Sequence, residues 1–106
     1  MPSYQAPLQD MRFIAQYLKQ EVVAPSPELC ELFDLDLFQA IVVEADRFAQ
    51  GLMLPTNRSA DVFGAQLQQG EVTTTPSWNE LYQTFIESGW IGLALPESVG
   101  GQGLPR

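Results

Sequence analysis

The chain has 106 residues, of which 45% are hydrophobic, a composition that suits one small globular domain and shows no low-complexity tract. Its net charge of −8, from 13 acidic and 5 basic residues, repels phosphate groups, so we expect neither nucleic acid nor an anionic membrane as a partner. No apolar run of about 18 residues could cross a bilayer, and the polar N-terminus does not resemble a signal peptide.

The first predicted helix covers about residues 7–22. Its apolar residues follow a three-then-four spacing: Leu8, Met11, Ala15, Leu18 and Val22, with Ile14 beside them. Phe13 and Tyr17 lie off this stripe, so we expect the helix to be covered on more than one side. The stretch 24–27 contains two prolines, each of which disfavours helix in the residue before it. We therefore divide the chain into an N-terminal helical extension, residues 1–24, and a main helical domain, residues 25–106.

Two helices are predicted next, a short one over Glu28–Phe33 and a long one over about Asp36–Leu54. The long helix has one apolar face: Phe38, Ile41, Val42, Ala45, Phe48, Ala49 and Leu52. Burial of this face outweighs the Glu44–Arg47 ion pair, which is worth only a few tenths of a kcal/mol. Pro55 removes a backbone donor and should end or kink the helix near Met53. Whether helix resumes after residue 55 is left open.

Residues 63–75 are predicted to form a loop with at most a very small hairpin, since Gly64 and Gly70 flank a polar stretch and residues 71–74 favour strand. The last helix then begins with Thr75 as N-cap and Pro76 at the first helical position, or with a capping box of Ser77 and Glu80. Its apolar face is Trp78, Leu81, Tyr82, Phe85 and Ile86. Gly89 should end this helix in a left-handed conformation, with Trp90 folding back on Phe85. The expected fold class is all-α, with about three or four helices.

The chain is poor in residues for catalysis or metal binding. It has no histidine, which excludes histidine-based triads, zinc sites with histidine ligands and proton transfer by histidine. Cys30 is the only cysteine and cannot form an internal disulfide, which indicates a reducing compartment, and we expect the cytoplasm. Because Glu28 and Glu31 flank it and disfavour the thiolate, a structural role is favoured over a nucleophilic one. The acidic cluster Glu28, Glu31, Asp34 and Asp36 lacks EF-hand spacing and is interpreted as a solvated face.

The glycine-rich run 100–103 invites comparison with phosphate-binding loops. Such a loop needs a strand before it and a helix after it, whereas here a helix comes before it. Close backbone packing is therefore the favoured interpretation. The aromatic residues are interpreted mainly as core, but a few helices can hardly cover all of them, so we expect an exposed apolar patch that acts as an interface. The candidate structural and interface residues are Trp78, Tyr82, Phe85, Gly89, Trp90, Pro96, Gly100, Gly101 and Gly103; no catalytic, cofactor-binding or metal-binding residue is predicted.

Several segments together resemble a known family. The C-terminal stretch reads helix, Gly89-Trp90, a short apolar run, Pro96-Glu97 and Gly100-Gly101-x-Gly103-Leu104. The middle contains Leu54-Pro55-x-Asn57-Arg58-x-x-Asp61-x-x-Gly64 and Gly70-x-Val72-x-x-x-Pro76. This order is similar to that of the N-terminal α-domain of the acyl-CoA dehydrogenases. Residues 4–13 resemble the N-terminal extension of a branch with larger subunits, the one that contains the 3-methylmercaptopropionyl-CoA dehydrogenases.

The resemblance implies a role within a larger enzyme. Members of this family use FAD to desaturate acyl-CoA thioesters between the α and β carbons, and their later domains supply much of the flavin site and the catalytic carboxylate. This chain would then bind no cofactor and catalyse nothing alone. Its partners would be the remaining domains or subunits of an acyl-CoA dehydrogenase, with acyl-CoA only in the assembled enzyme, in a homo-oligomer. The alternative is a free-standing, non-catalytic helical interaction module or accessory subunit.

Overall fold

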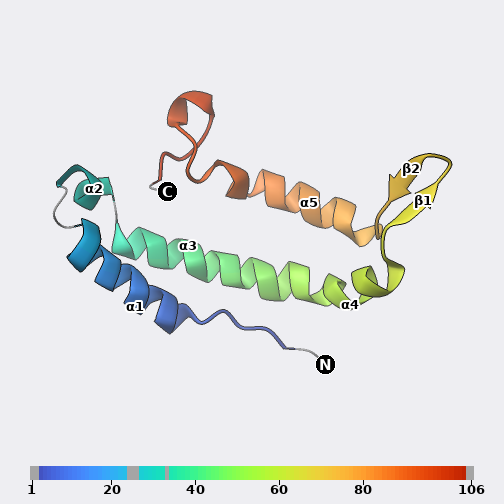
Figure 1. Ribbon diagram of the computed structural model, residues 1–106, viewed down its shortest axis with the longest axis horizontal. Helices are drawn as coiled ribbons and strands as arrows, with labels where there is room; N and C mark the ends of the chain where they lie inside the picture. The colour runs from blue at the N-terminus through green and yellow to red at the C-terminus, as the bar shows by residue number, and fades with distance from the viewer. Residues whose placement is uncertain (1–2, 24–26, 33, 105–106) are drawn as a thin grey trace.

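The computed structural model describes residues 3–23, 27–32 and 34–104 (Figure 1). Helix α1 (Leu8–Leu18) continues into a π-helical turn, Lys19–Val23, and the short α2 (Pro27–Leu32) follows. Helix α3 (Leu35–Phe48) continues through a second π-helical turn, Ala49–Met53, into α4 (Leu54–Phe63). A hairpin of β1 (Gln66–Gln68) and β2 (Glu71–Thr73) leads to α5 (Ser77–Glu87), which is followed by the 3-10 turns Trp90–Gly92 and Glu97–Val99. The predicted small helical fold with a long central helix is confirmed.

The regular α-helix is interrupted at Ala49–Met53, close to where Pro55 was predicted to end or kink it, and helix then resumes. Helices α3 and α4 form one continuous rod, because the wider π-helical turn changes the hydrogen-bond register just before the proline. There the N–H of Leu54 donates to the carbonyl of Ala49, five residues back. Pro55 therefore falls in the first turn of α4, where a missing N–H disturbs the helix least.

Asp34 begins the long helix. Its carboxylate accepts hydrogen bonds from the backbone N–H groups of Asp36 at 2.9 Å and Leu37 at 3.1 Å, which would otherwise have no partner within the helix. We expect Asp34→Ala to lower the free energy of unfolding by about 1 kcal/mol. Urea unfolding followed by circular dichroism would measure the loss, with Asp34→Asn as a control that keeps the cap. Equal losses in both variants would contradict a capping role.

The hairpin is as small as the sequence indicated. Gln69 and Gly70 at its turn have φ angles of 53° and 80°, and two successive positive φ values are typical of the tight turns that join short antiparallel strands. Gln66 pairs with Thr73, and Gln68 pairs with Glu71. All six strand residues are exposed, so neither face of the hairpin is packed against the rest of the described chain.

The ends of α5 only partly follow the prediction. Neither expected side-chain cap is formed among the described residues; instead the carbonyls of Thr75 and Pro76 accept hydrogen bonds from the N–H groups of Trp78 and Asn79. Thr75 is buried, and its hydroxyl oxygen lies 3.5 Å from that of Ser77, so its side chain is turned away from the cap. The C-terminus agrees with the sequence, since Gly89 adopts the left-handed conformation with φ 79°.

The described residues form an open, flat arrangement. Helices α1 and α5 lie on opposite sides of the long helix (Figure 1). The radius of gyration is 17.8 Å, compared with about 13 Å for a compact domain of this length. Among the described residues only Ala15, Asp46, Ala60 and Thr75 are buried, and no large side chain is fully covered. The apolar faces of these helices therefore do not close around a core.

Some predictions fall outside the described residues. These are the predictions of a linker at residues 24–26, of a helix end at Phe33 and of a structural role for the side chain of Cys30. For the part of the chain that is described, no helix is both long and apolar enough to cross a bilayer.

Candidate functional site: an aromatic groove and a glycine-rich loop

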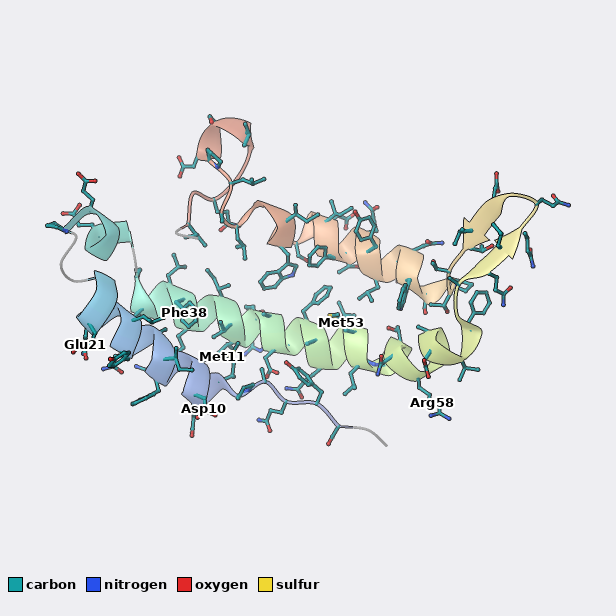
Figure 2. The ribbon with its side chains drawn as sticks, viewed as in Figure 1. Asp10, Met11, Glu21, Phe38, Met53 and Arg58 are labelled. Carbon is teal, nitrogen blue, oxygen red and sulfur yellow. The ribbon has the colours of Figure 1, made fainter. Side chains whose placement is uncertain are left out.

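An apolar groove of about 460 Å³ lies between the long helix and α5. Phe48 of α3 and Met53 of the π-helical turn form one side, and Trp78, Tyr82 and Phe85 of α5 form the other. Figure 2 shows side chains of these two elements pointing into the space between them. None of the residues that line the groove is charged. It is therefore suited to an apolar partner surface and offers no charged group for catalysis.

Phe48, which lines this groove, also packs against two other aromatic rings. Its ring centroid lies 6.0 Å from that of Phe85 and 6.2 Å from that of Trp90, with tilted and edge-on geometries that aromatic pairs favour. The sequence predicted a contact between Trp90 and Phe85, and the structure places both rings on Phe48. Trp78 and Tyr82, which also line the groove, are 45% and 60% exposed. The aromatic residues are thus half core and half surface.

The indole N–H of Trp90 is buried and has no hydrogen-bond partner among the described residues. A buried donor without an acceptor costs roughly 1–3 kcal/mol. Trp90 therefore contributes through its apolar ring and its contact with Phe48, and its polar atom weakens that contribution.

The glycine-rich loop folds back on the segment that follows α5. The N–H groups of Gly101, Gln102 and Gly103 donate to the carbonyls of Pro96, Gly92 and Leu95 at 2.8–3.0 Å. The N–H groups of Val99, Gly100 and Leu104 likewise donate to carbonyls of this region. Since these amides are already bonded within the chain, the loop has no free cradle of N–H groups for a phosphate.

Gly101 is required by a close backbone contact. A Cβ atom at this position would lie 2.1 Å from the carbonyl oxygen of Leu95 and 2.4 Å from its carbonyl carbon, far inside van der Waals contact. Gly100 and Gly103 have φ angles of 85° and 66°, which disfavour other residues. Pro96 precedes the second 3-10 turn, and its carbonyl accepts from both Val99 and Gly101. The loop is therefore a fixed backbone structure.

Asp46 is a structural residue that sequence reasoning missed. It lies on α3, and only 9% of it is exposed. One carboxylate oxygen accepts from the N–H of Ala6 at 2.8 Å, and the other accepts from the side-chain amide of Gln50 at 2.7 Å. The other acids of the long helix, Asp36, Glu44 and Asp61, are exposed. Nothing in the sequence around Asp46 distinguishes it from these surface acids, so its burial could not be predicted.

The other charged residues that bear on the predictions lie at the surface. The predicted Glu44–Arg47 ion pair is formed, but both side chains are largely exposed, so it stabilises the helix little. The acidic residues Glu28, Glu31, Asp34 and Asp36 are all exposed. Within the described ranges, no group of three or more acidic or thiol side chains is arranged to hold a metal ion.

Comparison with known proteins relates the chain to a characterised enzyme. No protein-family model matches the chain. Over 104 residues, 98% of the chain, it is 31% identical to a 3-methylmercaptopropionyl-CoA dehydrogenase of Ruegeria pomeroyi. The chain is homologous to a segment of an acyl-CoA dehydrogenase. This confirms the resemblance inferred from the sequence motifs, including the branch. The homologous segment makes up 18% of the relative, so the chain spans less than a fifth of that acyl-CoA dehydrogenase.

Proposed function

We propose that this chain is the N-terminal helical part of an FAD-dependent acyl-CoA dehydrogenase and that it docks on the remaining domains without catalysing alone. The observation that supports this most directly is the similarity to an acyl-CoA dehydrogenase along 98% of the chain. The assembled enzyme would oxidise an acyl-CoA thioester between its α and β carbons, and we expect it to be a homo-oligomer. The single cysteine suits a reducing compartment such as the cytoplasm.

The exposed surface supports a docking role. The accessible surface of the chain is 8331 Å², whereas a compact protein of 11.8 kDa exposes about 5,900 Å². The excess of roughly 2,400 Å² is several times the 800 Å² or so that one partner contributes to a standard interface. A partner of domain size, rather than a short peptide, is therefore expected to cover the exposed surface of the chain.

The described residues do not fit a flavin site of their own. The groove is lined by no basic side chain that could pair with a phosphate, and the amides of the glycine-rich loop are bonded internally. FAD would supply the acceptor for the hydride that leaves the β carbon. We assign its binding, and the carboxylate that removes the α-proton, to the remainder of the enzyme.

A complementation experiment tests this proposal. The Ruegeria pomeroyi enzyme without its homologous segment would be mixed with this chain, and its flavin absorbance and acyl-CoA-dependent reduction of an electron acceptor would be measured. We expect the chain to restore both. Trp78→Ala combined with Tyr82→Ala should prevent this, because it removes the exposed aromatic surface of the groove. The adjacent exposed Gln83→Ala, which lies outside the groove, should leave it unchanged.

The opposite outcome favours the alternative function. If the chain restores neither flavin binding nor activity, yet self-associates in light scattering and binds an apolar dye, it is a free-standing helical interaction module. A monodisperse monomer that binds no dye would contradict docking through the groove under either function.

A further inference from the structure

The N-terminal segment 3–7 passes beside the C-terminal part of α3, where Ala6 is bonded to Asp46, and then runs away from the helix (Figure 1). It belongs to no helix or sheet, and its side chains are mostly exposed; only Ala6 is half-buried. Apart from Tyr4, which is 48% exposed, the segment offers little apolar surface to hold it in place, so a specific polar contact is needed as well.

Asp46 provides that contact. The bond from the N–H of Ala6 to its carboxylate joins residues 40 apart in the chain. Gln50, one helical turn further along, binds the other oxygen and fixes the orientation of the carboxylate. A hydrogen bond to a charged acceptor is stronger than a neutral one, and a buried carboxylate that loses a partner is costly. The segment and α3 are thus joined at one defined point.

Tyr4, in the same segment, lines a second groove of about 550 Å³. Tyr4 and Trp78 both line this groove, and Ala49, Met53 and Leu54 of the long helix line it between them. Met53 and Trp78 also line the aromatic groove described above, so the two grooves adjoin. The position of the segment therefore determines how much of this apolar surface is open.

We propose that residues 3–7 form a strap that closes one side of the adjoining grooves and is released when the Ala6–Asp46 hydrogen bond opens. With the bond formed, Tyr4 stands as a wall facing Trp78. With the bond broken, no other hydrogen bond between the described residues holds the strap to the long helix, and only the side-chain contact of Tyr4 remains. The apolar side chains of the long helix that line the second groove then become more accessible. This inference concerns the chain itself and does not depend on the proposed enzymatic role.

Amide hydrogen exchange of Ala6 in the full chain tests the attachment. We expect the Ala6 amide to be protected relative to Gln5, and Asp46→Ala to accelerate its exchange by roughly ten- to a hundredfold. Asp46→Asn, which keeps an acceptor oxygen but no charge, should give a smaller acceleration. Glu44→Ala is the matched control, since it removes the same charge from an exposed position on the same helix, and it should leave Ala6 unchanged.

The gating role is tested separately with anilinonaphthalene sulfonate, a fluorescent dye that binds apolar surface. Tyr4→Ala should increase dye binding while Ala6 stays protected, and Asp46→Ala should increase it at least as much. Circular dichroism would show that α3 is retained. An Ala6 amide that exchanges as fast as Gln5 in the wild-type chain would overturn the strap. Unchanged dye binding in both Tyr4→Ala and Asp46→Ala would overturn its control of the groove.

Discussion

Replacing Phe48 by alanine is expected to lower the free energy of unfolding by about 3 kcal/mol, near the lower limit for aromatic residues in protein cores. The ring is only half-buried, but it is the one that contacts both Phe85 and Trp90. Its loss leaves α5 and the segment after it without their main aromatic contact with the long helix. Urea unfolding followed by far-UV circular dichroism would measure the change.

Phe13→Ala is the matched control for this variant. Phe13 also lies on a helix, but 72% of it is exposed and it belongs to neither groove. We expect its replacement to change stability by less than about 0.5 kcal/mol, as is usual for surface positions. Similar losses in the two variants would show that Phe48 is not the centre of the packing between α3 and α5.

Gly101→Ala should be as damaging, although it adds only a methyl group. The new Cβ would meet the backbone of Leu95 at 2.1 Å, and a backbone group cannot move aside as a flexible side chain can. Relief requires the loop to open and to lose the hydrogen bonds that Gly101, Gln102 and Gly103 donate. We expect a loss of about 3 kcal/mol, the upper end of the usual cost of overpacking, with the unfolding midpoint in urea as the measurement.

Gly92→Ala serves as the control in the same loop. A Cβ at Gly92 would approach the Cα of Gly101 only to 3.5 Å, which is ordinary contact, and its φ is not positive. We expect a change of less than about 1 kcal/mol. If Gly101→Ala were tolerated as well as Gly92→Ala, the close approach of Gly101 to Leu95 would not exist in solution.

The helices and the glycine at the end of α5 could be predicted because local rules determine them. The three-then-four spacing of apolar residues located α1, α3 and α5, and Gly89 marked a helix end that requires a positive φ. Pro55 located the interruption of the long helix but not its form, because the cost of a proline depends on the hydrogen-bond register. A π-helical turn placed it in the first turn of α4, and no residue pattern indicated that turn.

The contacts between distant segments could not be predicted in this way. Thr75 is an ordinary helix-capping residue, yet its side chain is buried and does not cap. Asp46 looks like a surface acid, and its partner Ala6 contributes a backbone N–H that carries no sequence signal. The sequence predicted an exposed apolar patch from its many aromatic residues, but it did not predict a groove. Which rings would pack on Phe48 and which would stay exposed depends on how the helices are arranged.

The glycine-rich loop has a consequence for any surface that meets it. Its hydrogen bonds run within residues 92–104, so its conformational entropy is already lost when the chain folds. Two exposed apolar side chains of this segment, Leu95 and Val99, are presented by a preorganised backbone. A partner that binds residues 92–104 would therefore need to order little more of this backbone, and the affinity of binding would depend mainly on shape complementarity.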